Sequence, residues 1–319
     1  MKISILMSVY NGERTIDKAL NSILNQTYTN FEVIIINDGS TDGSLEIINK
    51  YTQKDSRFIV VDNENQGLTK SLNTAYKFSS GELICRLDAD DQYESIKLEK
   101  QLRFMKENPE VGLLGTNAKL ESNGKIYAQT NCTFKDNKDV LNLLSKRKAF
   151  FCHSSWCMKR SVFETLNGYN EFFKKAQDYD FLLRALNITN ISIIKDPLTI
   201  LHISSQTISH DNENTQFIYA TTALFNFYNK TIDLNKKYSI IYKGLKEFNF
   251  NKHYNNFLLA LKIKRKLKTK KLAWIINLGL ANITNALVGY LKIKKLNKSI
   301  YKSAIKYREN LEIIHKFTK

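Results

Sequence analysis

The chain has 319 residues, 43% of them hydrophobic, which is enough for one large domain with a sizeable core or for a domain with an extension. Its four cysteines form no C-x-x-C pair and no Cys/His cluster with zinc spacing, which argues against a disulfide scaffold or a structural zinc site. The net charge is +17 and the N-terminal stretch lacks the pattern of a secretory signal, so we expect a cytoplasmic protein with an anionic partner.

The positive charge is confined to the last part of the chain. Residues 1–229 contain 26 Lys and Arg against 27 Asp and Glu, whereas residues 230–319 contain 22 against 4. This change in composition predicts a domain boundary near residue 230. A basic extension of this kind favours a membrane surface, a nucleic acid or an acidic polymer as its partner.

Strand-like and helical patterns alternate through about the first 115 residues. Apolar runs predict strands over residues 3–10, 31–38, 57–62, 81–88 and 111–116. Apolar residues at helical spacing predict helices over residues 15–26, 44–53, 67–79, 95–108 and, further on, 176–187. Ser44 is expected to cap the second helix. The alternation predicts a mostly parallel sheet covered by helices on both faces, and from residue 215 onward the pattern is helical and increasingly basic.

Polar residues and glycines follow the first four predicted strands. The first strand ends in "SVYN" (8–11), the second in "NDG" (37–39), and the third is followed by "NENQG" (63–67). Ligands of an open parallel sheet bind beyond the carboxyl ends of its strands, so we expect these segments to line one crevice. Asp38 could accept a hydrogen bond from a base or a sugar, and the glycines allow close backbone approach. Such a crevice suits a nucleotide.

The fourth strand ends in an acidic cluster, "RLDADD" (86–91). Asp88 and Asp90 point to the same side if the extended backbone continues, and such a pair suits Mg²⁺ or Mn²⁺ completed by phosphate oxygens and water. A surface turn that binds no ligand remains the alternative, because D-x-D and segments like "DGSTDGS" (38–44) are also common in such turns. The chain lacks G-x-G-x-x-G after the first strand and lacks a P-loop motif, which argues against a dinucleotide dehydrogenase and a P-loop NTPase.

The order and spacing of these motifs resemble an inverting family 2 glycosyltransferase. The resemblance spans about residues 1–210 and rests on "SVYNGERTIDKALNSILNQTYTNFEVIIINDGSTDGS", "NQGLTKSLN", "GELICRLDADD" and "LEKQL". It implies the GT-A fold, a Rossmann-like, mostly parallel central sheet flanked by helices. Together with the charge boundary it implies a glycosyltransferase domain over 1–229, with a nucleotide-sugar half (1–115) and an acceptor half (116–229), followed by a helical, strongly basic extension (230–319).

The resemblance also implies roles for residues that would bind the donor substrate. This donor would be a nucleotide-sugar, with a UDP-sugar as the favoured one. Val9, Tyr10 and Asn11 would line the pocket for the base and ribose. Asp38 would hold the base, and the glycines beside it would admit the nucleotide. Arg86 matches an arginine that often precedes the acidic motif near the donor.

The same resemblance implies a divalent cation, Mn²⁺ or Mg²⁺, that bridges the diphosphate. Asp90 would ligate this cation, and Asp88 would contact the ribose or the sugar. His202, in "PLTILHISSQTIS" (197–209), resembles a family histidine near the metal and the diphosphate. For His202 a core or surface position remains the alternative.

The acceptor side carries a second part of the family signature. "FFCHSSWCMKRSVFETLNGYNE" (150–171) resembles the acceptor segment, and "KAQDYDFLLR" (175–184) resembles the acidic motif at the start of a helix. Inverting transfer needs a general base for the acceptor hydroxyl, and by analogy this base is Asp178. The alternative for Asp178 is a carboxylate that stabilises the helix dipole.

Residues 272–291 carry no charge and lie between the lysine-rich segments 262–271 and 292–298. The uncharged stretch is long enough to cross a bilayer, but Asn277, Asn282 and Asn285 would be costly at its centre. We therefore expect an amphipathic helix at the interface, with a packed helix and a true span as alternatives. Residues 262–298 would then hold the protein at an anionic surface. The resemblance implies that this surface is the inner face of the cytoplasmic membrane, where the protein would lie peripherally.

These observations favour a metal-dependent, inverting hexosyl- or N-acetylhexosaminyltransferase. Its acceptor would be a saccharide or a lipid-linked glycan in capsule, O-antigen or exopolysaccharide synthesis. The alternative is a nucleotidyltransferase that makes nucleotide-sugars, which would want a Gly-rich N-terminal loop where "SVYNGERT" (8–15) offers one glycine. A nucleic-acid partner is not expected. Such a partner would bind through the basic extension, and its binding would not depend on the acidic motif.

Overall fold

The structure, a computed structural model, describes residues 1–145, 151–203, 215–228, 233–235 and 238–239. The strands are β1 (Ile3–Val9), β2 (Phe31–Asp38), β3 (Phe58–Asn63), β4 (Leu83–Arg86), β5 (Gln92–Tyr93), β6 (Val111–Ser122), β7 (Lys125–Gln129), β8 (Cys157–Lys159) and β9 (Asn190–His202). The helices are α1 (Ile16–Leu24), α2 (Ser44–Lys54), α3 (Leu68–Lys77), α4 (Lys97–Glu107), α5 (Asn137–Ser145), α6 (Arg160–Thr165), α7 (Gln177–Ala185) and α8 (Thr215–Tyr228), with a short 3₁₀ turn, η1, at His153–Ser155.

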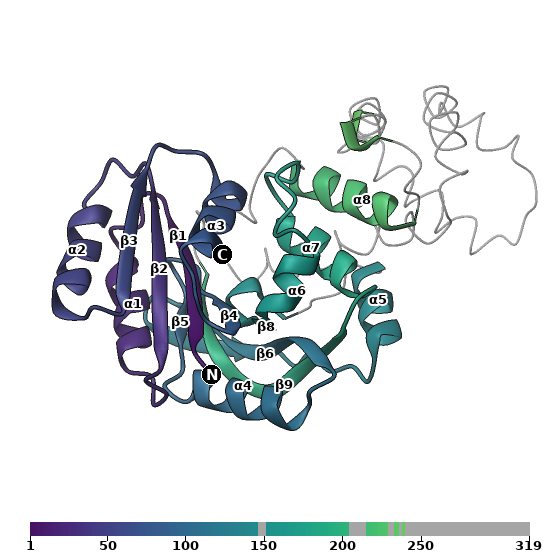
Figure 1. The fold of residues 1–319 in the computed structure, drawn as a ribbon, viewed down its shortest axis with the longest axis horizontal. Coiled ribbons are helices and arrows are strands. Elements are labelled where there is room, and N and C mark those ends of the chain that lie inside the picture. Colours follow the sequence, from purple (N-terminus) through teal and green to yellow (C-terminus); the bar gives the residue numbers. More distant parts are fainter. Residues whose placement is uncertain (146–150, 204–214, 229–232, 236–237, 240–319) are drawn as a thin grey trace, which may run out of the picture.

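The described strands form one curled sheet in the order β3-β2-β1-β4-β8-β6-β9-β5, and β7 pairs with β6 as a hairpin (Figure 1). The β3-β2-β1-β4 half is parallel, as expected for a nucleotide-binding fold. β8 then runs antiparallel between β4 and β6, and β6 and β9 are parallel. β6 runs through residues 115 and 116, so the two predicted halves share one sheet.

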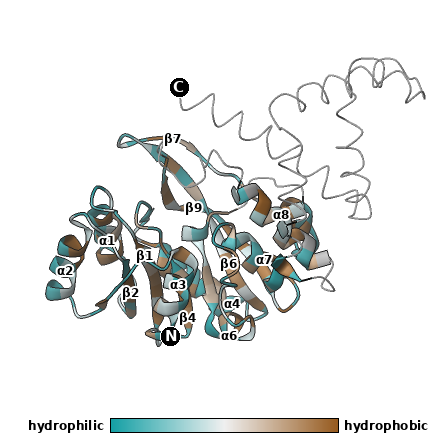
Figure 2. Cartoon of the chain, turned by 90° about the horizontal axis from the view of Figure 1, so that it is seen from above, coloured by the Kyte–Doolittle hydropathy of each residue, from teal (hydrophilic) through white to brown (hydrophobic). Residues whose placement is uncertain are grey.

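Helices cover both faces of the sheet because side chains of each strand alternate between them. In β1, Ile3, Ile5 and Met7 join a buried cluster with α1, α2 and α4, whereas Leu6 joins a second cluster with α3, α6, α7 and α8. The two clusters form the core on opposite faces of the sheet. Figure 2 shows the β6–β7 hairpin projecting past these layers.

The predicted elements of the first half are confirmed within a few residues at their ends, except that the strand predicted over residues 111–116 continues to residue 122 as β6. The cap of α2 was predicted wrongly. Gly43 occupies the N-cap position and makes no side-chain bond, while Asp42 Oδ1 accepts the Ser44 N–H at 3.1 Å and the Ser44 hydroxyl. A carboxylate two residues earlier therefore does the work expected of Ser44, as in an Asx turn.

In the part of the chain that the structure describes, no helix is both long and apolar enough to cross a membrane. The uncharged stretch 272–291 and the lysine-rich segments 262–271 and 292–298 lie outside the described residues. The last long described helix, α8, packs against α7 (Figure 1).

Candidate active site

The acidic motif begins where β4 ends, in the middle of the sheet between β1 and β8. Arg86 is the last residue of β4, and its side chain is buried at 1% exposure. Its guanidinium donates to the Leu87 carbonyl and to the Asp88 carboxylate. Burial alone would raise the pKa of Asp88, but the Arg86 charge, His153 and the hydrogen bonds from Ser154 and Arg86 together leave this pKa below its usual value. Arg86 is thus the positive charge that lets neighbouring carboxylates share this turn.

Asp91 is a buried structural member of the motif. Its Oδ2 accepts the Ser154 hydroxyl, and its Oδ1 accepts the backbone N–H of His202 at 3.1 Å. Ser154 lies in η1 and also donates to Asp88 Oδ2 at 3.0 Å. Asp91 and Ser154 therefore tie the end of β4 to η1 and to the end of β9, which fixes the backbone of the acidic turn.

Asp90 differs from its two neighbours in the partners of its carboxylate, to which its own backbone N–H donates. Among the described residues, no side chain donates a hydrogen bond to it, and no ion pair neutralises it. Burial, followed by the Asp88 charge, raises its pKa to about 6, while Arg86 and His202 act in the opposite direction. A partly buried carboxylate with surplus negative charge around it is suited to a cation.

The side chains of the acidic turn fit a cation that takes only some of its ligands from the protein. In the described part of the chain, no three His, Cys, Asp or Glu side chains are arranged to hold an ion by themselves. A hard divalent ion such as Mg²⁺ needs no such cage, because it binds through one or two carboxylates and completes its shell with phosphate oxygens and water. Asp90 can supply the first of these ligands, so the residues present fit a cation that arrives with a diphosphate.

His202 lies at the end of β9, beside the acidic motif. Its Nδ1 is 2.7 Å from Oε2 of Glu121, a residue of β6 that sequence reasoning did not single out. Burial would raise the pKa of Glu121, but the hydrogen bonds from His202 and from the Gly124 N–H outweigh burial and lower it. The side chain of His202 is thus held by Glu121, and its backbone is held by Asp91 of the acidic turn.

Asp178 lies in the first turn of α7, which starts after Ala176 in the left-handed conformation with φ of 56°. Its Oδ1 accepts the Tyr179 N–H at 2.8 Å. Burial raises its pKa, the Asp88 charge raises it further, and Arg86 acts in the opposite direction. Asp178 therefore lies within electrostatic range of Arg86 and Asp88, although about ninety residues separate them along the chain. The neighbouring carboxylate Asp180 instead pairs with Arg184 at 2.7 Å.

Asp38, at the end of β2, is buried and organises the loop after β3. Its Oδ1 accepts the Gln66 N–H at 2.9 Å and the Ser71 hydroxyl at 2.8 Å, and its Oδ2 accepts the Gly67 N–H at 3.0 Å. These bonds join "NENQG" and the start of α3 to the end of β2. The base-holding role of Asp38 stays a prediction. In the structure, Asp38 holds the loop after β3 in place.

The end of β1 presents three residues in different ways. The Val9 side chain is fully buried in the core, so only its backbone could contact a nucleotide. Tyr10 is 56% exposed, which leaves its ring open to solvent. Asn11 has a φ of 51°, donates its N–H to the Ser40 hydroxyl at 3.0 Å and accepts the Thr41 N–H at 2.8 Å. Asn11 thus braces the "DGSTDGS" loop, and Tyr10 alone offers an accessible aromatic face.

His153 is a buried, neutral residue of η1. Its Nε2 lies 2.7 Å from the Tyr169 hydroxyl, and burial lowers the pKa of His153 to about 3. The ring stacks edge-on against Trp156 with centroids 4.6 Å apart. The contacts of His153 are those of a packed structural residue.

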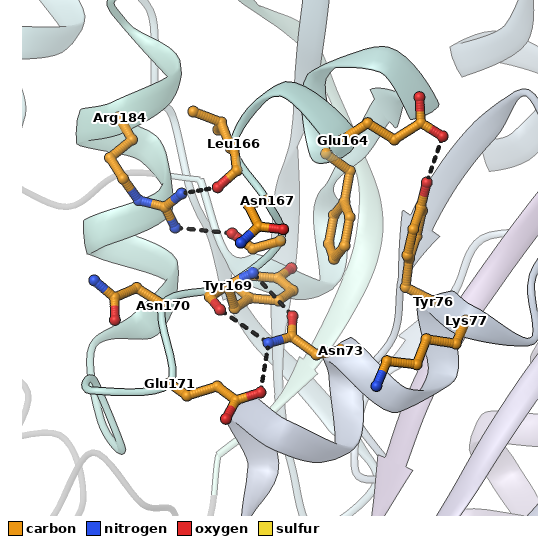
Figure 3. A pocket seen from close by; sticks show the side chains of 12 residues that line it. Asn73, Tyr76, Lys77, Glu164, Leu166, Asn167, Tyr169, Asn170, Glu171 and Arg184 are labelled. Carbon is orange, nitrogen blue, oxygen red and sulfur yellow. Dashed lines mark hydrogen bonds between the residues drawn. The ribbon is translucent and has the colours of Figure 1, made fainter.

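A pocket of about 700 Å³ lies between α3 and the segment from α6 to α7 (Figure 3). None of the predicted site residues lines it. Asn73 of α3 exchanges hydrogen bonds with the backbone of Tyr169 at 2.9 Å each, and Arg184 of α7 donates to the carbonyls of Leu166 and Gly168. The pocket walls therefore hold residues 166–171 against α3 and α7, which helps to fix the start of α7.

Comparison with known proteins agrees with this geometry. The sequence model of glycosyl transferase family 2 matches residues 4–166. The O-antigen biosynthesis glycosyltransferase WbnJ of Escherichia coli is 33% identical over 187 residues, which is 58% of this chain and 72% of WbnJ. The hyaluronan synthase of Pasteurella multocida is 26% identical over 325 residues, 98% of this chain but 31% of the synthase. Across such relatives the chain spans from 19% to 74% of the relative's length.

Two solved structures share the fold. TarS (residues 1–349) of S. aureus, in complex with UDP-GlcNAc, has a TM-score of 0.63 at 22% identity, covering 99% of this chain and 92% of that one. The mannosyltransferase PcManGT of Pyrobaculum calidifontis, in complex with GDP-Man and Mn²⁺, has a TM-score of 0.56 at 17% identity, covering 96% and 86%. At these identities the likeness establishes the architecture alone, which is GT-A. The chain belongs to glycosyl transferase family 2.

Proposed function

We propose that the protein is an inverting, metal-dependent glycosyltransferase of surface polysaccharide synthesis, acting on a saccharide or lipid-linked acceptor. The observation that supports the proposal most is the buried Asp178 carboxylate, whose pKa is raised by burial and which interacts electrostatically with Asp88 and Arg86. Asp178 thus lies within electrostatic range of an acidic turn that fits a cation and a diphosphate. The relationship to O-antigen enzymes such as WbnJ supports the choice of polysaccharide synthesis.

The reaction needs only one displacement. Asp178 accepts the proton of the acceptor hydroxyl as the hydroxyl oxygen attacks C1 of the sugar, and the bond from C1 to the diphosphate oxygen breaks. Attack from the face opposite the leaving group inverts the configuration at C1. Asp90, with Asp88 and His202 beside it, would hold a divalent cation, which when bound stabilises the charge of the leaving nucleoside diphosphate. Arg86 holds Asp88 in place.

The donor is proposed to be a UDP-sugar. A structural neighbour that binds UDP-GlcNAc supports this choice, although another neighbour binds GDP-Man. The exposed Tyr10 ring would stack on the base, and the loops braced by Asn11 and Asp38 would line the ribose. Mn²⁺ beside GDP-Man in that second neighbour supports the use of a divalent cation.

Replacing Tyr10 with Ala is expected to weaken UDP binding about 10-fold or more, because stacking on an aromatic ring contributes about 1–3 kcal/mol per base. Calorimetric titration with UDP in the presence of Mn²⁺ measures the change. Tyr10→Phe is the matched control and keeps the affinity, since it retains the ring. Equal affinities of the wild type and Tyr10→Ala would remove Tyr10 from the donor site.

The function itself is tested by incubating the protein with a panel of nucleotide-sugars, saccharide acceptors and Mn²⁺ or Mg²⁺. The proposal predicts release of a nucleoside diphosphate, strongest with UDP-sugars, and loss of turnover on chelation. Pyrophosphate as the product would instead identify a nucleotidyltransferase. Turnover that survives complete chelation would refute the metal requirement.

We also propose that residues 1–229 form the catalytic domain and that the basic extension 230–319 binds an anionic membrane surface through residues 262–298. The charge boundary supports this division, as does the uncharged stretch between two lysine-rich segments. Binding from the cytoplasmic side would bring the active site to lipid-linked acceptors.

Replacing the lysines of segment 262–271 with Gln in the full chain is expected to abolish co-sedimentation with vesicles that contain anionic lipid. Each lysine near such a surface contributes about 1 kcal/mol. The control replaces an equal number of exposed lysines within residues 1–145 and should sediment as the wild type does. If the segment 262–271 variant still sediments fully, the membrane role of this segment is wrong.

A further inference from the structure

Glu121 is a buried carboxylate that the proposed chemistry has not yet used. It is 6% exposed and lies near the end of β6, directly opposite His202 of the parallel strand β9. The two backbones are joined there, since the Ile203 N–H donates to the Glu121 carbonyl at 2.8 Å. The Glu121 side chain accepts from His202 Nδ1 at 2.7 Å. The described ion pairs give it no Lys or Arg partner.

The position of Glu121 is fixed from two sides. Besides His202, its carboxylate accepts the N–H of Gly124. Gly124 belongs to the turn of the β6–β7 hairpin, in which Asn123 and Gly124 both have positive φ, 51° and 79°. A two-residue turn of this kind suits the twist of the hairpin and leaves the Gly124 N–H pointing back at the strand. The carboxylate cannot swing away from His202 without losing this bond.

The hydrogen bond defines which nitrogen of His202 carries the proton. An ionised carboxylate can only accept, so Nδ1 must donate. In the neutral imidazole the lone pair then lies on Nε2, at the far edge of the ring. The backbone N–H of His202 is bound to Asp91 at 3.1 Å, which anchors the residue to the acidic turn. This bond brings His202 to the residue next to Asp90, and His202 acts electrostatically on the Asp90 carboxylate.

We propose that Glu121 is a positioning residue that holds His202 as the Nδ1–H tautomer and so presents Nε2 to the divalent cation carried by the nucleotide-sugar. The inference rests on the proposed function, because it needs a cation at Asp90. Histidines that ligate metals commonly donate their other ring N–H to a carboxylate, and loss of that partner typically weakens metal binding about 10- to 100-fold. Glu121 itself touches neither the cation nor the substrate.

Mn²⁺ binding in the presence of UDP, followed by the EPR signal of free Mn²⁺, tests the inference on the full chain. Glu121→Ala is expected to raise the Mn²⁺ Kd about 10-fold or more. Glu121→Gln should rescue most of the affinity, because its carbonyl oxygen can still accept from Nδ1. Glu94→Ala is the matched control, since the Glu94 carboxylate pairs with Lys119 of the same strand at 2.7 Å, and the Mn²⁺ Kd should stay unchanged. A wild-type Kd in Glu121→Ala, or an equal rise in the Glu94→Ala control, overturns the inference.

Two further results separate positioning from a general loss of stability. In the variant that combines Glu121→Ala with His202→Ala, the Mn²⁺ Kd should equal that of His202→Ala alone, whereas independent effects that multiply contradict the proposal. In the wild-type protein, ¹⁵N NMR of His202 should show the proton on Nδ1, and a proton on Nε2 overturns the proposal even if Glu121→Ala does not fold. Nucleotide-sugar turnover by the wild type reports separately on the proposed function: its absence removes that function, whereas turnover with an unaffected Glu121→Ala removes only the role of Glu121.

Discussion

Asp178→Asn is expected to lower kcat for sugar transfer by about 10²- to 10⁴-fold, the usual contribution of a general base. Asparagine keeps the shape and the hydrogen bond to the Tyr179 N–H, but it cannot accept the acceptor proton. Donor affinity should change little, because the donor residues lie at the ends of β1, β2 and β4. Initial rates of nucleoside diphosphate release, with UDP titrations alongside, separate the two effects.

Asp139→Asn is the matched control for Asp178→Asn. Asp139 also lies in the first turn of a helix, α5, and accepts a backbone N–H there at 3.0 Å. If Asp178 serves only the helix dipole, the two variants should have similar, small effects. Full turnover in Asp178→Asn would remove this residue as the base.

The raised pKa of Asp178 also gives a pH dependence. Transfer needs the ionised base, so kcat should fall as the pH drops through this raised pKa. Stability changes in the opposite direction to kcat as the pH rises. The folded state disfavours the ionised form of Asp178, so Asp178 lowers the free energy of unfolding once the pH rises above its usual pKa of 3.8 and through the raised value. Asp178→Asn should therefore be at least as stable as the wild type at neutral pH.

Asp90→Asn is expected to abolish the response to Mn²⁺ and at the same time to stabilise the metal-free protein. The pKa of Asp90 is raised from 3.8 to about 6, so its ionisation opposes folding fully above pH 6 and not at all below its unfolded value. Removing this charge should add about 1–3 kcal/mol of stability at pH 8. Thermal unfolding with and without Mn²⁺ and UDP measures both effects: the two ligands should stabilise the wild type but not the variant.

Asp196→Asn provides the comparison for Asp90→Asn. Asp196 is half exposed and pairs with Lys100, so its loss should change the melting temperature little and leave the Mn²⁺ response intact. A metal-free Asp90→Asn protein that is clearly less stable than the wild type would show that Asp90 has a structural partner. A wild-type Mn²⁺ response in Asp90→Asn would exclude Asp90 as the metal ligand.

The parallel half of the fold could be predicted from the sequence because its signals are local. Buried β2 contains the apolar run VIII (33–36), and α1 buries Ile16, Ala19, Leu20 and Ile23 at helical spacing, as predicted. The other half depends on contacts between distant segments. β8 is only three residues long and is defined by its pairing with β4 on one side and β6 on the other. β9 contains Pro197 at a shift in its register against β6. Neither feature has a pattern that a single sequence reveals.

The candidate site divides in the same way. The acidic turn was visible because its carboxylates are adjacent. Asp178 was singled out because "KAQDYDFLLR" (175–184) resembles the acidic motif of the family. The roles of Asp38 and Asn11 as loop braces were not, since their partners are backbone N–H groups 28 and 30 positions away along the chain. Glu121 and Ser154 carried no signal, because a single Glu in a strand or a single Ser in a turn gains meaning only from what folding brings beside it.

In the proposed mechanism, Asp178 and the acidic turn act on opposite sides of C1 of the sugar in a single displacement. The configuration of the product tests this most directly. With an α-linked UDP-sugar, Mn²⁺ and a saccharide acceptor, the anomeric coupling in the ¹H NMR spectrum of the new glycoside should be that of a β-linkage. A product with the α-configuration of the donor would contradict the single displacement and the role of Asp178 as its base.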